Sequence, residues 1–314
     1  MRVSIKVYLK QVGRGSKGAS DLSRSDATDL FGQLLSGKAT ALELGAFCMA
    51  MRIKGESAEE LSGFYEALTP YLPSLVLGRP VWLLPSYNGA RKTTLLTPLL
   101  AKMLVDKGYS VLVHGAHEEA HRTSSEQVFT QMGWPIVEQL SELARVLEQQ
   151  SMAYCPLTVL CPALSRILSV REVIGVRNTG HVLAKLLNPI QSESFQVTNY
   201  THPLYPQVFD AFYKNFSTNV VMMRGHEGEP VASPRRLPEL YLRYKDSGLV
   251  KMRVPQYFSD TSDATESIVP TAMLTAQRYQ RMLTQQEPMP SSLVAQVDTM
   301  HHAYGSVNTL DASQ

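Results

Sequence analysis

Residues 85–93 are the part of this sequence best suited to binding an anion. They lie between two apolar runs and contain one glycine, the aromatic Tyr87 and the adjacent cations Arg91 and Lys92. The pattern predicts a strand, a loop and then a helix. Backbone N–H groups in such a loop, together with the helix dipole, attract phosphate. The sequence therefore predicts a phosphate loop that carries cations where such loops usually carry glycines.

The end of this loop resembles a Walker A motif without its complete pattern. Gly89 precedes Arg91, Lys92 and Thr93, but the first glycine of that motif is absent. This excludes an ordinary nucleotide triphosphatase. Two interpretations remain: Arg91, Lys92, Thr93 and the nearby amides hold a phosphate, or the cations are simply exposed at the entry to a helix.

Two other groups of cations stand out. Residues 1–24 hold six cations against one acid, among them Lys10, Arg14 and Lys17. Such a cluster can bind phosphate backbones, or it can be a solvated basic face. Farther along, Arg171 and Arg177 flank a glycine. Arginine suits two-pronged recognition of carboxylate or phosphate, although arginines at a helix turn are often structural.

Composition limits the class of protein. With 314 residues, 44% apolar residues and a net charge of +2, the chain can bury a large core, and its net charge does not by itself indicate nucleic acid. No apolar run approaches the roughly 20 residues of a membrane helix. Cys48, Cys155 and Cys161 make an odd number of thiols, which favours reduced, buried cysteines and a cytoplasmic protein.

The elements that must position these residues follow from hydrophobic periodicity and capping patterns. Residues 1–72 predict a small helical domain, with part of 160–190 packed on it, and residues 73–314 predict an α/β domain. Strands are expected at 81–84, 110–113 and 220–223. Helices are expected at 27–35, 41–53, 57–68, 94–107, 124–132, 137–150, 163–187, 274–283 and 293–303. Alternating strands and helices predict a mostly parallel central sheet.

The segment 175–189, which reads GVRNTGHVLAKLLNP, is similar to a motif of the anthranilate phosphoribosyltransferase family within glycosyltransferase family 3. The resemblance extends over nearly the whole chain, from the helices at 42–56 through His114-Gly115 to Pro288-Met289-Pro290. It implies a nucleoside phosphorylase/phosphoribosyltransferase-like fold, a helical domain beside an α/β domain, and a homodimer formed through the helical domain.

The family's active-site motifs are altered here. Its diphosphate loop, G-T-G-G-D, falls on residues 85–89, where the early glycines and the aspartate are missing. Its K-H-G-N-R motif falls on residues 113–117 without either cation, and its magnesium-binding D-E pair falls on Pro230 and Val231. The resemblance leaves His114 and Arg171 as inherited acceptor-site positions. Because Mg²⁺ requires oxygen ligands, we expect no metal site and no catalytic residue.

The loop sequence PSYNGARK and the Gly225-x-Glu227-Gly228-Glu229 segment resemble a DNA-binding branch of this family, the YbiB-like paralogues. That branch implies a homodimer that binds DNA or RNA, single-stranded or without sequence preference, and has no cofactor. Tyr87 would then stack on an unpaired base or pack against the cleft wall. The expected contacts are Lys10, Arg14, Lys17, Ser86, Tyr87, Asn88, Gly89, Arg91, Lys92, Arg177 and Lys185.

Two other functions remain open from the sequence. One is a phosphoribosyl- or other glycosyltransferase that acts on an anthranilate-like or other aromatic acceptor with Mg²⁺ and phosphoribosyl diphosphate, which Arg171 and His114 favour. The other is a sensor of a small ligand or of phosphate that uses the inherited cleft.

Overall fold

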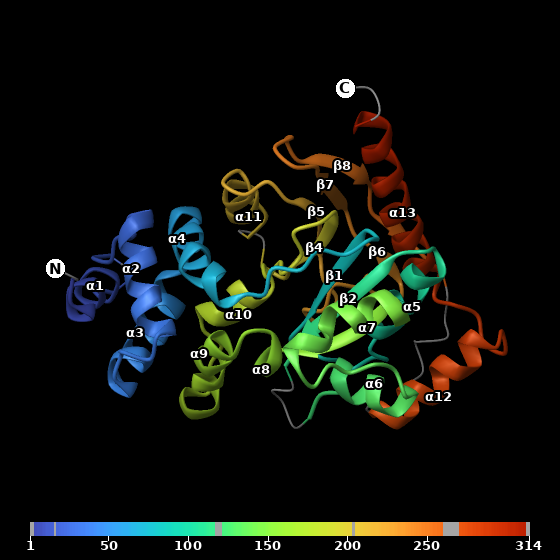
Figure 1. The fold of residues 1–314 in the computed structure, drawn as a ribbon, viewed down its shortest axis with the longest axis horizontal. Helices are drawn as coiled ribbons and strands as arrows, with labels where there is room; N and C mark the ends of the chain where they lie inside the picture. The colour runs from blue at the N-terminus through green and yellow to red at the C-terminus, as the bar shows by residue number, and fades with distance from the viewer. Residues whose placement is uncertain (1–2, 16, 117–120, 203–204, 260–269, 312–314) are drawn as a thin grey trace.

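The computed structural model describes residues 3–15, 17–116, 121–202, 205–259 and 270–311. Figure 1 shows a helical domain, at the left, beside a larger α/β domain. The helical domain contains α1 (Ile5–Val12), α2 (Arg24–Leu35), α3 (Ala41–Lys54) and α4 (Ala58–Leu68), followed by the short η1 (Thr69–Tyr71). Capping boxes begin α3 at Thr40 and α4 at Ser57, and the second of these confirms the predicted helix start.

The α/β domain is built on a seven-stranded sheet in the order β3-β2-β1-β4-β5-β7-β8. The first five strands in this order run parallel, and β7 and β8 add to the edge in antiparallel fashion. The predicted fold class is therefore confirmed. The strands are β1 (Val81–Ser86), β2 (Ser110–Gly115), β3 (Met152–Pro156), β4 (Ser194–Tyr200), β5 (Asn219–Arg224), β7 (Leu240–Arg243) and β8 (Val250–Arg253); β6 (Arg236–Leu237) and β9 (Gln256–Tyr257) pair separately.

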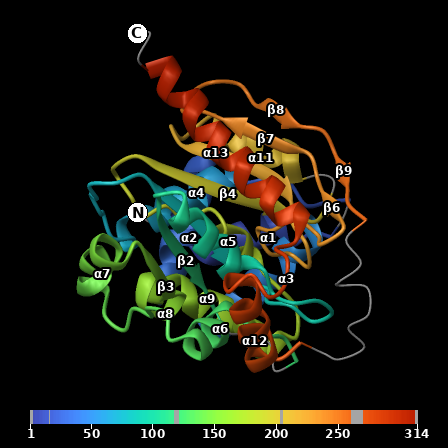
Figure 2. The ribbon, with the colours of Figure 1, turned by 90° about the vertical axis from the view of Figure 1, so that its right-hand side faces the viewer.

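Both faces of the central parallel strands are buried, as parallel strands require. Every residue of β1 and β2 is buried, and their side chains alternate between two cores. Trp82 and Leu84 join the core beneath α5, α6, α12 and α13, whereas Val81 and Leu83 join the core shared with the helical domain. Figure 2 shows α13 running beside the β7–β8 edge.

The remaining helices are α5 (Thr97–Asp106), α6 (Ser125–Met132), η2 (Leu140–Glu142), α7 (Leu143–Gln150), α8 (Leu157–Leu160), α9 (Pro162–Ile174), α10 (Thr179–Ala184), α11 (Tyr205–Tyr213), α12 (Ala272–Leu283) and α13 (Ser291–Asp311).

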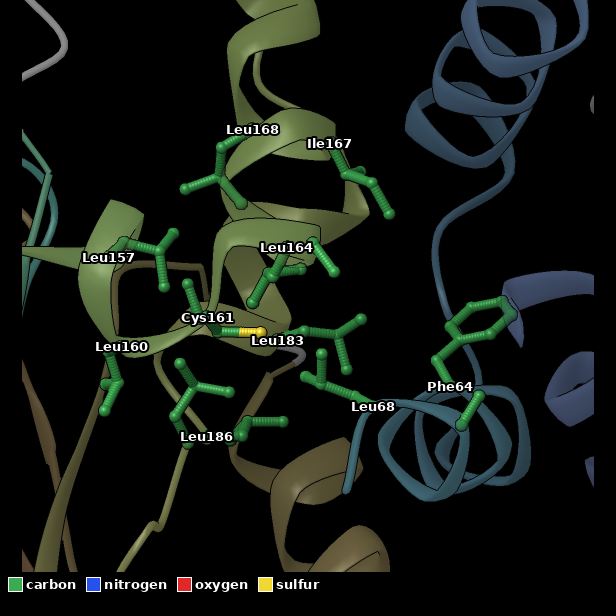
Figure 3. Packing of buried hydrophobic residues seen from close by; sticks show 14 of the residues in the cluster. Phe64, Leu68, Leu157, Leu160, Cys161, Leu164, Ile167, Leu168, Leu183 and Leu186 are labelled. Atoms are coloured by element: carbon green, nitrogen blue, oxygen red, sulfur yellow. The ribbon is translucent and has the colours of Figure 1, made fainter. Parts of the chain in front are cut away.

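Helices α9 and α10 join the two domains. Figure 3 shows Leu164, Leu183 and Leu186 facing Phe64 and Leu68 of α4, and all of these side chains belong to one buried cluster. This continuous apolar contact holds the helical domain against the C-terminal ends of the parallel strands, where α/β proteins usually place their sites.

Several elements differ from the sequence prediction. The first helix after β1 begins at Thr97, three residues later than expected. The N-terminal basic segment includes a helix, α1. The sequence pattern does not predict strand β4, because its buried Gln196 and Thr198 break the apolar run; both are hydrogen-bonded, Gln196 to the Lys185 carbonyl at 2.8 Å.

Cys48, Cys155 and Cys161 are free and buried, as predicted for apolar fillers, and burial raises the pKa of the Cys48 thiol to about 12. Within the described ranges, no helix is both long and apolar enough to cross a membrane.

Candidate functional site

The loop between β1 and α5 lies at the centre of the sheet. The strand order reverses between β1 and β4, since β2 flanks β1 on one side and β4 on the other. In open α/β sheets, this switch point at the C-terminal ends of the strands is the usual ligand site. The loop thus lies where the sequence predicts a phosphate site, but its amides are already engaged.

Glu229 occupies the first half of the loop. One carboxylate oxygen, Oε1, accepts hydrogen bonds from the backbone N–H groups of Asn88 and Gly89, both at 2.8 Å. The other, Oε2, accepts from the hydroxyls of Ser86 at 2.6 Å and Thr97 at 2.7 Å. Glu229 is 1% exposed. Four donors therefore surround a single buried carboxylate, as they would surround an anionic ligand.

Glu227 occupies the second half. Its carboxylate accepts from the backbone N–H groups of Arg91 at 2.9 Å, Lys92 at 3.1 Å and Thr93 at 3.2 Å. The Arg122 guanidinium lies 3.6 Å away. Burial raises the pKa of Glu227, but the hydrogen bonds from Arg91 and Lys92 outweigh this effect and hold it below its ordinary value. A second carboxylate thus takes the place that a second phosphate could occupy.

The turn that carries both glutamates depends on glycine. Glu227 and Gly228 both have positive φ, 49° and 86°, and a Cβ on Gly228 would lie 1.6 Å from Asn88 Nδ2. The absence of a side chain lets the 225–229 turn approach the loop closely enough for both carboxylates to reach it.

Arg177 and Lys185 bind the outer side of this assembly. The Arg177 guanidinium donates to the Tyr87 carbonyl at 2.5 Å and to Asn88 Oδ1. Lys185 Nζ donates to the Gly228 carbonyl at 3.0 Å. Burial, reinforced by the nearby Arg177 charge, lowers the pKa of Lys185 to about 8. The two cations therefore clamp the loop and the glutamate turn together.

Comparison with known proteins identifies the family. Residues 6–69 match the helical bundle domain of the glycosyl transferase family. YbiB of Escherichia coli (strain K12) is 36% identical over 309 residues, covering 96% of this chain and 95% of YbiB. The chain belongs to the YbiB family of anthranilate phosphoribosyltransferase-like proteins.

More distant relatives share the fold. An anthranilate phosphoribosyltransferase of Anaeromyxobacter sp. (strain Fw109-5) is 26% identical, but the match covers 54% of this chain and about half, 51%, of that enzyme. The structure of anthranilate phosphoribosyltransferase from Thermus thermophilus superposes with a TM-score of 0.72 at 17% identity, covering 96% of this chain and 89% of the other. The enzyme of Saccharomyces cerevisiae, in complex with PRPP and Mg, gives a TM-score of 0.66 at 12% identity, with 90% and 80% coverage.

In this YbiB-family chain, Tyr87 has a packing role. Its side chain is 1% exposed, and its hydroxyl lies 2.7 Å from Nδ1 of the fully buried His114. A base cannot stack on a ring that has no exposed face, so the stacking role suggested for Tyr87 is wrong for this conformation. Burial lowers the pKa of His114 to about 3, which leaves a neutral imidazole behind the loop.

The predicted anion contacts separate into distinct groups. Ser86, Tyr87, Asn88, Gly89, Arg177 and Lys185 meet at the loop, but Ser86 and the amides of Asn88 and Gly89 are bound to Glu229. The side chains of Arg91 and Lys92 are exposed. Lys10, Arg14 and Lys17 are also exposed, but they belong to or follow α1, which lies at the end of the helical domain farthest from the sheet (Figure 1).

The inherited acceptor positions are separated from one another. Arg171 is half-buried and lines a cavity of about 610 Å³ with Gly115 and Glu126. His114 does not line this cavity, because its ring points behind Tyr87. Residue 117, the last position of the altered K-H-G-N-R motif, lies outside the described residues.

The family's magnesium site does not fit this chain. Pro230 and Val231, at the positions of the metal-binding pair, are buried and have no side-chain oxygen. Among the described residues, no group of three His, Cys, Asp or Glu side chains could hold a metal ion. Glu227 and Glu229, the nearest carboxylates, are engaged by the loop. Hard Mg²⁺ would find no free carboxylate pair here.

Glu227 and Glu229 stand out in the sequence as part of a segment shared with the DNA-binding branch, but no pattern there indicates their contact with the loop. Thr97, which binds Glu229, carries no signal in the sequence at all. One signal for the glutamates was available: Glu227 and Glu229 stand two residues apart just after β5, at the same edge of the parallel sheet as the loop that follows β1.

Proposed function

We propose that this protein is a homodimeric, sequence-nonspecific nucleic-acid-binding member of the YbiB family that has lost phosphoribosyl transfer and uses no cofactor. One observation carries the loss of catalysis: the carboxylates of Glu227 and Glu229 accept hydrogen bonds from five backbone amides of the loop after β1, two of them at the positions of the family's diphosphate motif. A diphosphate would have to displace both charges and would meet their repulsion. No residue is therefore assigned a catalytic role.

Exposed cations support phosphate-backbone binding. With its amides bound internally, the loop presents the side chains of Arg91 and Lys92 to solvent. Lys10, Arg14 and Lys17 form a second exposed group. Contacts of this kind attract any phosphate backbone and do not read sequence. The small net charge of +2 is compatible with this role, because local groups of cations set the surface potential near them.

The helical domain offers a surface for self-association. Leu42 and Ile53 on α3 are 83% and 65% exposed, and Val173 at the end of α9 is 88% exposed. Exposed apolar side chains gathered on one domain mark interaction sites. Helix α1 packs on α3, so a dimer through this surface would bring the Lys10, Arg14 and Lys17 groups of two protomers near one another.

The test is a titration of a fluorescently labelled oligonucleotide at increasing salt. We expect binding to weaken as salt rises from about 50 to about 200 mM. In a plot of the logarithm of the binding constant against the logarithm of salt concentration, each phosphate contacted should contribute a slope of about −0.7 to −0.9. Affinity that does not change with salt would contradict the phosphate-driven proposal.

A glycosyltransferase with an aromatic acceptor is the second candidate, supported by the cavity that contains Arg171 and Gly115. It requires Glu227 and Glu229 to leave the loop. Calorimetry with phosphoribosyl diphosphate separates the two candidates: we expect no binding with or without Mg²⁺, whereas magnesium-dependent micromolar binding would favour the enzyme.

A further inference from the structure

A cavity of about 910 Å³ lies at the end of the sheet opposite to the Glu227 and Glu229 carboxylates. Ser194 and Asn219, the first residues of β4 and β5, line it, whereas the two glutamates follow the last residue of β5. The rest of its lining comes from the end of α4 and the segment after it, the segment that leads into β4, the segment before β5 and the turn after β7. We call it the linker cavity, because chain segments that pass between the two domains form one of its walls.

The walls of the linker cavity are held in place by hydrogen bonds of the protein itself. The Leu75 N–H donates to the Pro189 carbonyl at 2.9 Å, and the Gln191 N–H donates to the Leu75 carbonyl at 2.7 Å. Across the cavity, Asn219 Oδ1 accepts from the Lys245 N–H at 3.1 Å. Segments from both domains are therefore fixed around a preformed space, and a volume of this size is that of a small-molecule site.

The lining is polar but carries no surplus charge. Ten of the described lining residues are Ser, Thr, Asn or Gln, and only Glu193 and Lys245, of opposite sign, are charged. Within the part of the chain that the structure describes, the side chains of Gln191, Ser217 and Thr218 make no hydrogen bond to the protein. The cavity thus offers uncharged donors and acceptors to a ligand and lacks the positive charge that a phosphate or a polyanion needs.

One wall of the linker cavity is aromatic. Phe216 is half-buried and lines the cavity together with Tyr65. The two ring centroids are 5.0 Å apart in an edge-to-face arrangement, and Phe212 packs behind them, 4.7 Å from the Phe216 centroid. Because this cluster fixes the rings, their exposed parts form a rigid apolar surface beside the hydroxyl and amide groups.

We propose that the linker cavity binds an uncharged carbohydrate of one or two sugar rings. A sugar ring combines hydroxyl groups, which would bond to Gln191, Ser217 and Thr218, with a face of C–H groups, which would pack on the Phe216 wall. A fully apolar ligand would leave the polar side chains without partners. This site is separate from the loop that holds Glu227 and Glu229, and the inference does not depend on the proposed nucleic-acid function.

The test titrates the full-length protein with D-glucose, D-ribose and maltose and follows binding by saturation-transfer NMR. D-glucose 6-phosphate is the charged counterpart of D-glucose. Gln191→Ala removes a hydrogen-bonding amide and Ser217→Trp fills the space; both residues are exposed, so the fold is expected to survive. Gln150→Ala and Ser141→Trp, at exposed residues in and before α7, are the matched controls. Thermal unfolding checks each variant.

We expect at least one of the three uncharged sugars to bind, and D-glucose 6-phosphate to bind more weakly than D-glucose. Gln191→Ala should weaken the bound sugar by about fivefold, the effect of one lost hydrogen bond. Ser217→Trp should abolish its signal, and both controls should match the wild type. Tighter binding of maltose than of D-glucose would show that the cavity holds two rings; equal binding would show that it holds one.

Three outcomes overturn the inference: no signal from any of the three uncharged sugars, stronger binding of D-glucose 6-phosphate than of D-glucose, or wild-type sugar binding by both Gln191→Ala and Ser217→Trp. None of these bears on the proposed function, which the oligonucleotide titration tests separately.

Discussion

Glu229 accepts a hydrogen bond at 2.8 Å from the backbone N–H of Gly89, 140 residues earlier in the chain. This contact joins the end of β5 to the loop after β1, across the intervening β4. It puts a carboxylate of the protein where a phosphate loop would hold its ligand. The same contact therefore ties the end of β5 to the loop and engages two of the loop's backbone amides.

Removal of Glu229 should destabilise the fold. In Glu229→Ala, the amides of Asn88 and Gly89 and the hydroxyls of Ser86 and Thr97 lose their acceptor inside the protein. Because buried donors without partners are costly, we expect the free energy of unfolding to fall by about 3 kcal/mol or more. Urea denaturation measures this, with the exposed Glu148→Ala as the control. Equal stability of the two variants would contradict the role of Glu229 as the acceptor for these four donors.

Glu227 should stabilise the protein in a pH-dependent way. Its folded pKa lies below its ordinary value of 4.5, so the folded state binds the proton less readily than the unfolded state. The stabilisation is then complete above about pH 4.5 and is lost as pH falls through the lower folded pKa. We expect the stability difference between wild type and Glu227→Gln to shrink in acid. A stability difference between the two proteins that grows as pH falls would contradict this prediction.

Tyr87 should matter for stability rather than for binding. Tyr87→Ala empties a buried aromatic site and should lower the free energy of unfolding by about 3–5 kcal/mol. Tyr87→Phe keeps the ring and removes the hydrogen bond to His114, worth about 1 kcal/mol. Oligonucleotide affinity of Tyr87→Phe, measured by anisotropy below its unfolding temperature, should equal that of the wild type. A marked loss of affinity would mean that the loop opens to expose this tyrosine.

Lys185 should make nucleic-acid binding sensitive to pH. Its pKa is about 8, lowered by burial and by Arg177 and partly restored by Glu229. The side chain is charged below this pH and loses its proton as pH rises through it. We expect oligo(dT) affinity to fall between about pH 7 and 9 in the wild-type protein. In Lys185→Arg the charge persists, so this fall in affinity should be smaller. Identical pH profiles for the two proteins would show that Lys185 does not contribute to binding.

Charged substitutions on α3 should separate the proposed dimer. Leu42→Glu and Ile53→Glu each put a carboxylate on the exposed apolar surface, where it would be buried without a partner on association. Light scattering coupled to size exclusion should give a dimer for the wild type and a monomer for the double variant. Val76→Glu, at a valine 74% exposed in the connecting segment, is the control. A wild-type monomer, or a double variant that remains dimeric, would exclude this surface as the interface.

The sequence alone determined the fold class and the family. Apolar runs of strand length alternating with helical periodicity require a parallel sheet covered by helices, and capping signals such as Ser57 with Glu60 fixed a helix start. Local patterns of this kind survive folding because they record which side of each element is buried. The alteration of residues 85–89 and of Pro230-Val231 could also be read directly from the residue types.

Tertiary structure decided how the site is occupied. The bond between Glu229 and Gly89 depends on the parallel order of β1, β4 and β5 and on the positive φ of Gly228, neither of which any local pattern specifies. The same packing buries Tyr87 against His114. Residue types set which charges are present; the meeting of the strand ends set which charges neutralise one another and which remain exposed.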